Sequence, residues 1–325
     1  NYNMYVYIKK YISLSDKISL LISTSGTLGN KKFVILSKKN LITNTDQIID
    51  YLKITNKDVT ITTLPFSYSY GLSIINTHIF KRSKIVLNNS SVIERDFYNK
   101  VNKFKVSSFG GVPFTYTILN KINFFKKELP YLRYVTQAGG KIKDQDFINV
   151  YEATSKKNIK FFIMYGQTEA SPRISYVPYK HLPEKKNSIG IAVKNSKLKI
   201  LNKKGKVLKK SFTEGEIIFN GKNIFMGYSD SYLDLKNKKK EIQILHTGDI
   251  GYFDDDGFFY VSGRKKRIIK IFGQRINLDQ IDRHLNKKFK CYSMEYKDKL
   301  IVYTENKNSN EKIYKYLNQI VNLNK

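Results

Sequence analysis

Cysteine and histidine are scarce in this chain of 325 residues, and their scarcity excludes several kinds of site. Cys291 is the only cysteine, which rules out an internal disulfide and a cluster of thiolate metal ligands. We expect it to be a small apolar core residue in a reducing compartment. The four histidines suggest no catalytic triad, and we expect His246 to be a packed strand residue.

Long hydrophobic runs and a signal-peptide pattern are also absent. No apolar run reaches the length of a membrane span, and nothing at the start resembles a secretory leader. The chain begins with Asn1 rather than Met, so a missing N-terminal stretch could have held a targeting signal. On these grounds we expect no transmembrane segment and a cytoplasmic location.

Acidic residues are few beside basic ones, 27 against 58, which gives a formal net charge of +31. Such an excess can indicate a nucleic-acid or anionic-membrane partner. Here lysine is spread through every segment together with Asn and Ile, as in the run 236–240, and is not gathered on one face. We therefore interpret most of the charge as solvated surface and expect no nucleic-acid partner. A basic nucleic-acid-binding protein stays as the lower-ranked alternative, which predicts steeply salt-dependent binding.

A strand-like apolar run at residues 18–23 leads into hydroxyls, glycines and one lysine. The residues are Thr24, Ser25, Gly26, Thr27, Gly29 and Lys32. Glycines let backbone N–H groups approach a ligand closely, successive N–H groups form an anion-binding concavity, and lysine adds a mobile charge. The spacing is not that of the P-loop. The segment predicts a phosphate-binding loop, and a simple turn between two strands is the alternative.

Three further motifs follow in order along the chain. They are Tyr165-Gly166-Gln167-Thr168-Glu169, then Thr247-Gly248-Asp249, then Gly263-Arg264 leading to Ile269-Lys270 and Gly273. Together with the first loop, they resemble the signature series of the adenylate-forming superfamily. That family contains acyl-CoA synthetases, adenylation domains of peptide synthetases, and luciferases. The resemblance extends from about residue 23 to about residue 285, most of the chain.

The resemblance implies a nucleotide site. The loop residues with Lys32 would bind the β- and γ-phosphates of ATP, and Thr168 would bind the α-phosphate. Glu169 would hold Mg²⁺, a hard cation that takes a carboxylate together with phosphate oxygens. Lys32, Thr168 and Glu169 are the expected catalytic residues. The remaining expected nucleotide contacts are Tyr165 and Gly166, Gly139 and Gly140 on the adenine side, and Asp249 and Arg264 at the ribose.

The same resemblance implies an acyl pocket in two turns rich in aromatic and small residues. Its expected wall consists of Phe66, Tyr68, Tyr70, Gly71, Gly110 and Val112. For any single one of these residues, packing in the core is an equally good interpretation. An adenylation domain for α-amino acids usually has an Asp here, but no acid lies between Asp58 and Glu94. We therefore expect a fatty or other non-amino carboxylic acid.

Strand, turn and helix alternate through the first half, which favours a layered α/β fold with a parallel-sheet core and ligands beyond the strand ends. We expect this core at residues 1–187, a small β subdomain at 188–262, a hinge at 263–267 that includes Lys266, and a partial C-terminal α+β lid at 268–325. Helices are expected at 40–53, started by Asn40 or Thr43, and at 92–104, capped by Ser90 or Ser91. Residues 254–257 are expected to form a hairpin turn rather than a Ca²⁺ site.

Two departures from the family pattern concern the ends of the chain. Family members carry a long stretch before the phosphate loop, and their adenylating lysine lies in a glycine-flanked loop late in the lid. No glycine follows Gly273, and Lys312, Lys315 and Lys325 lack the matching context. We therefore expect a chain truncated at both ends. Within the phosphate loop, Leu28 and Lys31 also replace a usual Thr and Pro.

The expected function is ATP-dependent activation of a carboxylic acid to an acyl-adenylate, followed by transfer to a thiol. The thiol would be coenzyme A or the phosphopantetheine of an acyl carrier protein. The alternative is a non-catalytic nucleotide-binding homologue or fragment, which the absence of the lid lysine would explain.

Overall fold

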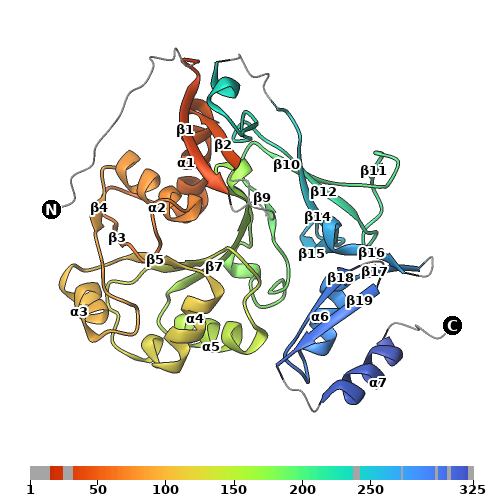
Figure 1. The fold of residues 1–325 in the computed structure, drawn as a ribbon. Coiled ribbons are helices and arrows are strands. Elements are labelled where there is room, and N and C mark those ends of the chain that lie inside the picture. The colour runs from red at the N-terminus through yellow and green to blue at the C-terminus, as the bar shows by residue number, and fades with distance from the viewer. Residues whose placement is uncertain are drawn as a thin grey trace. The chain divides into compact units, whose positions relative to one another are not determined.

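The computed structural model describes residues 15–24, 32–236, 242–271, 274–296, 299–305 and 309–320. They form two compact units, drawn in Figure 1. Unit 1 is built from residues 1–186, 190–197 and 220–245, and unit 2 from residues 187–189, 198–219 and 246–325. Within the described part of the chain, no helix has the length and hydropathy needed to cross a membrane.

Unit 1 contains a seven-stranded sheet in the order β4-β3-β5-β6-β7-β8-β9. Its strands are β3 (Val59–Ile61), β4 (Lys84–Val86), β5 (Ser108–Gly111), β6 (Tyr134–Gln137), β7 (Lys160–Gly166), β8 (Arg173–Tyr176) and β9 (Ile191–Ala192). The strands from β4 to β7 are parallel, whereas β8 is antiparallel to β7 and β9 is antiparallel to β8. The mostly parallel core that the sequence predicts is confirmed.

Helices cover both faces of this sheet. They are α1 (Lys38–Leu52), α2 (Ser69–Phe80), α3 (Arg95–Lys103), α4 (Pro113–Lys121) and α5 (Asp144–Ser155). In Figure 1, α1 and α2 lie on one face of the sheet, and α4 and α5 on the other. Every residue of β3, β5 and β6 is buried, as expected for parallel strands covered on both sides.

Two helix starts differ from the sequence expectation. Helix α1 begins after Ser37, whose hydroxyl accepts from the Asn40 backbone N–H, while the Asn40 side chain accepts from the Ser37 N–H. This reciprocal pair satisfies two free N–H groups at once, so Ser37 rather than Asn40 or Thr43 is the cap. Helix α3 begins at Arg95 instead of residue 92, because the N–H of Ser91 donates to the Glu94 carboxylate in the preceding turn.

A second sheet of unit 1 joins distant segments. It consists of β1 (Ile18–Thr24), β2 (Lys32–Ser37) and β13 (Tyr228–Ser229), in the order β1-β2-β13. Residues 226–228 were expected in the β subdomain, and that assignment is wrong for Tyr228, which pairs with Val34 of β2. Tyr228 therefore lies beside β2, the strand that begins at Lys32.

Unit 2 contains a five-stranded sheet in the order β11-β10-β12-β14-β15. Its strands are β10 (Lys197–Leu201), β11 (Val207–Leu208), β12 (Gly215–Asn220), β14 (Leu245–Phe253) and β15 (Phe259–Arg264). The predicted hairpin turn between β14 and β15 is confirmed. The Asp254 carboxylate in this turn accepts hydrogen bonds from the N–H groups of Asp256 and Phe258 and from the Tyr260 hydroxyl. This carboxylate organises the turn.

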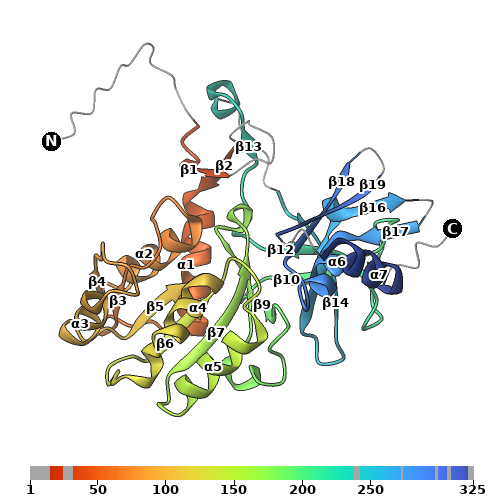
Figure 2. The ribbon, with the colours of Figure 1, turned by 60° about the horizontal axis from the view of Figure 1, so that its bottom comes forward.

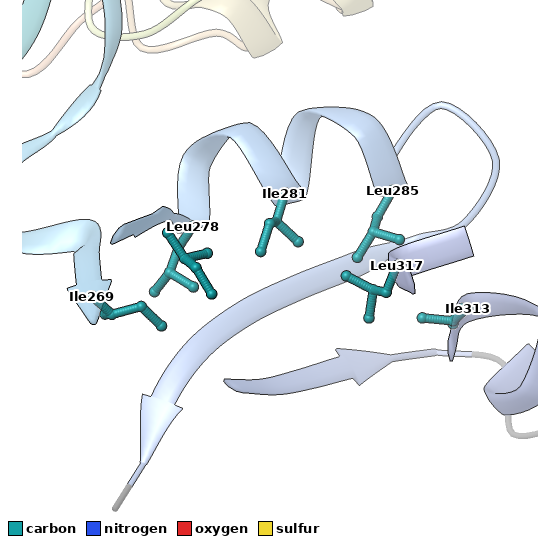
Figure 3. Packing of buried hydrophobic residues seen from close by; sticks show 7 residues of the cluster. Ile269, Leu278, Ile281, Leu285, Ile313 and Leu317 are labelled. Carbon is teal, nitrogen blue, oxygen red and sulfur yellow. The ribbon is translucent and has the colours of Figure 1, made fainter. Parts of the chain in front are cut away.

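Two hairpins and two helices complete unit 2, as Figure 2 shows from another side. They are β16 (Ile268–Ile271) with β17 (Gln274–Asn277), β18 (Cys291–Tyr296) with β19 (Lys299–Thr304), α6 (Leu278–Leu285) and α7 (Asn310–Ile320). Leu278, Ile281 and Leu285 share one face of α6 and pack against Ile269 and α7 (Figure 3). Cys291 is only partly buried against this cluster.

Candidate functional site

The expected phosphate loop connects β1 to β2. Ser25, Gly26, Thr27 and Gly29 lie outside the described residues, but the two ends of the loop are defined because Thr24 pairs with Lys32 across the hairpin. The Lys32 ammonium lies 3.7 Å from the Asp230 carboxylate and 6.0 Å from the centre of the Tyr228 ring. About half of the Lys32 side chain is exposed. The structure therefore places a solvent-accessible cation at the end of the expected loop.

The second motif lies where β7 ends. Tyr165 and Gly166 close the strand, and Thr168 and Glu169 follow in the short 3-10 turn η2 (Thr168–Ala170). The Thr168 hydroxyl lies 3.1 Å from the hydroxyl of Ser69, the first residue of α2. Polar side chains at the carboxyl end of a parallel strand are the usual ligand contacts of an α/β sheet.

Glu169 is held by a segment about 60 residues further along the chain. The Tyr228 hydroxyl donates to Glu169 Oε1 at 2.7 Å, and the Phe225 N–H donates to the Glu169 carbonyl at 2.8 Å. Burial, and next the neighbouring carboxylate, raise the pKa of the Tyr228 hydroxyl well above its ordinary value. Tyr228 therefore stays a neutral hydrogen-bond donor to the Glu169 carboxylate.

The Glu169 carboxylate fits a magnesium ion that is held mainly by a nucleotide. Mg²⁺ is usually bound by one or two carboxylates together with phosphates and water. The two carboxylate oxygens have about four acceptor positions, so one bond from Tyr228 leaves capacity for a metal. Among the described residues, no group of three or more His, Cys, Asp or Glu could hold a metal ion without such a ligand.

The expected acyl-pocket residues gather in two groups. A Cβ added to Gly139 would lie 2.9 Å from the Tyr68 hydroxyl and 3.3 Å from Val112, so these three residues adjoin. A Cβ added to Gly110 would lie 2.7 Å from the Tyr70 hydroxyl. The rings of Tyr68 and Tyr70 are 6.4 Å apart, which connects the two groups.

The other expected residues of this region lie close to the same turns. Gly71 belongs to α2, Phe66 is exposed before that helix, and the Gln137 side chain donates to the Gly140 carbonyl. Tyr70 is buried and donates to the carbonyl of Thr136 at 2.9 Å. Its hydroxyl is therefore part of the core packing, as the alternative interpretation of these aromatics foresaw.

The expected ribose residues are partners in one hairpin of unit 2. Asp249 of β14 lies opposite Arg264 of β15, and Arg264 Nε lies 3.1 Å from Asp249 Oδ1. Asp249 is buried, whereas the Arg264 side chain is 68% exposed. The Thr247 hydroxyl accepts from the Asp249 N–H and donates to the Ile217 carbonyl, which fixes the turn of the motif. A carboxylate beside a guanidinium can accept from one hydroxyl while the guanidinium donates to another.

Two further expectations concern unit 2. Lys266 lies in the exposed turn η5 (Lys265–Arg267), and its role as a hinge stays a prediction, as do the expected domain boundaries. His246 lies on β14 but is exposed, 3.5 Å from the Glu216 carboxylate, so the expectation of a packed histidine is wrong. The same carboxylate pairs with Lys265 at 2.9 Å.

Sequence reasoning missed three residues next to the expected site: Ser69, Tyr228 and Asp230. Ser69 could have been found from its place in the first turn of the expected substrate helix. The other two have no local signal, because only the pairing of β13 with β2 brings them to Lys32 and Glu169.

Comparisons with known proteins identify the family of the chain. A family model described as AMP-binding enzyme matches residues 9–229. The oxalate–CoA ligase of Arabidopsis thaliana is 27% identical over 272 residues, which cover 82% of this chain and 52% of that relative. The 2-succinylbenzoate–CoA ligase of Bacillus cereus is 28% identical over 285 residues, which cover 84% and 56%. The chain thus spans about half the length of the curated relatives it matches.

Solved structures share the fold. O-succinylbenzoate coenzyme A synthetase from Bacillus subtilis in complex with AMP matches with a TM-score of 0.74 at 23% identity, over 92% of this chain and 62% of that one. The complex of that enzyme with ATP and a magnesium ion matches with a TM-score of 0.72 at 23% identity, over 91% and 61%. The fold is therefore that of the acyl-CoA synthetases. The chain belongs to the AMP-binding enzyme family, within the adenylate-forming superfamily that its motifs resemble.

Proposed function

We propose that the protein activates a carboxylic acid with ATP and passes the acyl group to a thiol. The carboxylate attacks the α-phosphorus of ATP, the bond to pyrophosphate breaks, and the thiol then displaces AMP from the acyl-adenylate. The observation that carries the proposal is the arrangement at the end of β7, where Thr168 adjoins Ser69 and Glu169 is oriented by Tyr228. Family membership supports it, since the relatives' names are those of acid–CoA ligases.

Each residue has a defined task in this proposal. Lys32 binds the terminal phosphates, and Thr168 donates its hydroxyl to an oxygen of the α-phosphate. Asp249 and Arg264 bind the ribose hydroxyls. Glu169 would hold Mg²⁺, which neutralises phosphate charge when it is bound. Such fixed charges and donors accelerate the reaction by orienting the nucleophile and by stabilising charge that develops on phosphate oxygens.

The acid substrate is a carboxylic acid without an α-ammonium group. The first turn of α2 contains no acidic residue that could pair with an ammonium. The named acids of the relatives, oxalate and 2-succinylbenzoate, are not amino acids either. A fatty acid, the narrower expectation from the sequence, has no specific support here. Coenzyme A is the preferred thiol because the relatives are CoA ligases, and an acyl carrier protein is the other candidate.

The test is acid-dependent exchange of labelled pyrophosphate into ATP by the full-length protein, with a panel of carboxylic acids and Mg²⁺. We expect exchange with wild type and a loss of about tenfold to hundredfold in Glu169→Gln, because the metal loses a charged ligand. Glu152→Gln removes the same charge from an exposed position on α5 and should behave as wild type. Nucleotide binding without exchange for any acid would contradict the proposal and support the homologue without turnover.

A further inference from the structure

Unit 1 gathers basic residues at the edge of its sheet where the parallel strands begin. The register aligns the strand starts, with Lys84 at the beginning of β4 and Lys160 at the beginning of β7. Each helix leads to this edge through a connection to the next strand, and these connections are residues 53–58, 81–83, 104–107, 122–133 and 156–159. We call the connections, together with Lys84 and Lys160, the basic edge.

Basic residues outnumber acidic residues in every connection of the basic edge. Exposed examples are Lys57, Arg82, Lys105, Lys126, Lys127 and Lys156. The acidic residues are Glu128 and Asp58, of which Asp58 is buried and pairs with Arg133 at 2.9 Å. Among the strand-to-helix connections at the opposite edge of this sheet, only 138–143 contains basic residues. The fold therefore concentrates at one edge charges that are spread along the sequence.

Side-chain contacts join neighbouring connections of the basic edge. The Lys105 ammonium, before β5, lies 5.4 Å from the centre of the Tyr131 ring, before β6. The Lys157 ammonium, before β7, donates to the Lys126 carbonyl at 3.3 Å. Strands β5, β6 and β7 are adjacent in the sheet. The basic side chains in front of these three strands therefore form one continuous patch.

Large apolar side chains are exposed beside these charges. Ile79 and Phe80, the last residues of α2, are 64% and 51% exposed, and Phe104, which follows α3, is 44% exposed. A lysine near a helix C-terminus interacts favourably with the last carbonyls, which explains a cation at each helix end. It does not explain why apolar side chains are exposed next to the cations. Exposed apolar groups rimmed by charge indicate a surface that contacts a partner.

The chemistry of the basic edge fits an anionic lipid surface better than a nucleic acid. Single-stranded nucleic acids stack their bases on aromatic ring faces. Here ammonium groups lie over such faces, that of Lys105 over Tyr131 and that of Lys160 over Tyr179, at 5.4 and 4.7 Å from the ring centres. Ile79 has no ring on which a base could stack. A bilayer, in contrast, accepts apolar side chains at the level of its headgroups, and acidic headgroups attract lysine.

We propose that the basic edge of unit 1 binds the surface of a membrane that contains acidic phospholipids. The lysines contact the anionic headgroups, and Ile79, Phe80 and Phe104 enter the interface. Thr168 and Glu169 follow the opposite end of β7, so this binding leaves the candidate nucleotide residues of unit 1 accessible. The inference does not rest on the proposed function, because no residue of the candidate site takes part in it.

The test is flotation of the full-length protein with vesicles of phosphatidylcholine alone or of phosphatidylcholine mixed with phosphatidylserine. We expect the mixed vesicles to bind wild type about tenfold or more tightly than the neutral vesicles. The variant Lys57→Gln/Lys126→Gln/Lys156→Gln removes three exposed charges of the basic edge. Its affinity for the mixed vesicles should fall about tenfold to hundredfold, because each lysine near acidic lipid contributes to binding.

A matched control separates the basic edge from the general charge of the protein. Lys204→Gln/Lys206→Gln/Lys209→Gln removes the same charge from exposed positions of unit 2 and should bind as wild type. Phe80→Ser tests the apolar contribution. Its affinity should be lower than that of wild type even at high salt, where the attraction between charges is screened. Thermal unfolding at the wild-type temperature shows that each variant is folded.

The outcomes either support or overturn the inference. It is overturned if the edge variant and the control variant lose equal affinity, which is the behaviour of a basic protein without a specific surface. It is also overturned if wild type binds neither kind of vesicle, or if Phe80→Ser binds as wild type. Tighter binding of a single-stranded oligonucleotide than of mixed vesicles, lost in the edge variant, would assign the edge to nucleic acid instead.

The proposed function is tested separately by pyrophosphate exchange. The edge variant should keep wild-type exchange in the absence of vesicles. Vesicle binding that depends on the basic edge supports this inference even if no acid supports exchange. Exchange without vesicle binding supports the proposed function and contradicts this inference.

Discussion

The two candidate nucleotide carboxylates, Asp249 and Glu169, are held in opposite ways. Asp249 is buried, and its partner is a charged side chain, Arg264, on the adjacent strand of the same hairpin. Glu169 is half-buried, and its partner is the neutral hydroxyl of Tyr228, about 60 residues away in sequence. The first pair is fixed by local register, and the second only by the pairing of β13 with β2.

This difference suggests two distinct tasks. A carboxylate and a guanidinium side by side suit a fixed, neutral partner with several hydroxyls, such as a ribose. A carboxylate that is oriented by a neutral donor suits a cation. Substitutions should therefore separate binding of the nucleoside from the metal-dependent part of ATP binding.

The largest expected effect is that of Arg264→Met on AMP binding. Losing a charge-assisted hydrogen bond to the ribose should lower the affinity for AMP about tenfold to hundredfold. Arg264→Lys should keep part of the wild-type affinity. The measurement is isothermal titration of AMP without metal. Lys287→Met, which removes a charge from an exposed position in unit 2, is the control. Equal AMP affinity in Arg264→Met and wild type would remove Arg264 from the site.

A third carboxylate, Asp58, forms an ion pair with Arg133 that stabilises the fold and is not part of the candidate site. Burial alone would raise its pKa, but hydrogen bonds from Thr55 and Ser107 and the Arg133 guanidinium outweigh burial and lower the pKa. A lowered pKa means that this carboxylate stabilises the fold above the unfolded value of about 4 and loses that contribution as pH falls below it. Asp58→Asn should lower the free energy of unfolding by about 1–3 kcal/mol at pH 7.

The control for Asp58 is a surface carboxylate of the same unit. Asp50 pairs with Lys53 and Lys194 at 3.7 and 3.5 Å, and its side chain is 40% exposed. Asp50→Asn should lower the free energy of unfolding by less than about 1 kcal/mol. Denaturant unfolding at pH 7 and pH 3 measures the free energy of unfolding of wild type and of both variants. The account is contradicted if the loss of stability in Asp58→Asn is not smaller at pH 3 than at pH 7.

The smallest expected effect is that of Tyr228→Phe. Removing one neutral hydrogen bond to Glu169 should weaken MgATP binding by about threefold to tenfold. AMP binding without metal should not change, because the ribose pair is untouched. Tyr131→Phe, at an exposed phenol of unit 1, should change neither affinity. If Tyr228→Phe weakened AMP and MgATP equally, Tyr228 would be a residue of the fold rather than an orienting partner of Glu169.

Much of the fold could be predicted from the sequence, because its signals are local. Alternating strand and helix patterns located β3, α5, β7 and α6 within a few residues. The start of α1 was wrong because several Ser and Asn residues near Ser37 compete to cap the helix. Hydroxyl and amide groups at neighbouring positions differ too little in capping preference for sequence alone to decide.

Sequence could predict only those parts of the candidate site whose residues are close together along the chain. Asp249 and Arg264 lie in motifs joined by one hairpin, so their proximity follows from the turn at residues 254–257. Tyr228 could not be found in this way. It reaches Glu169 only through a strand pairing across nearly 200 residues.

The most direct test of the account is titration of AMP into wild type and Asp249→Asn, with Asp256→Asn in the neighbouring turn as the charge-matched control. We expect saturable binding to wild type and to Asp256→Asn, with affinity reduced about tenfold or more in a folded Asp249→Asn. Unchanged affinity in Asp249→Asn, or no binding by folded wild type, would contradict the assignment of a nucleotide site to this chain.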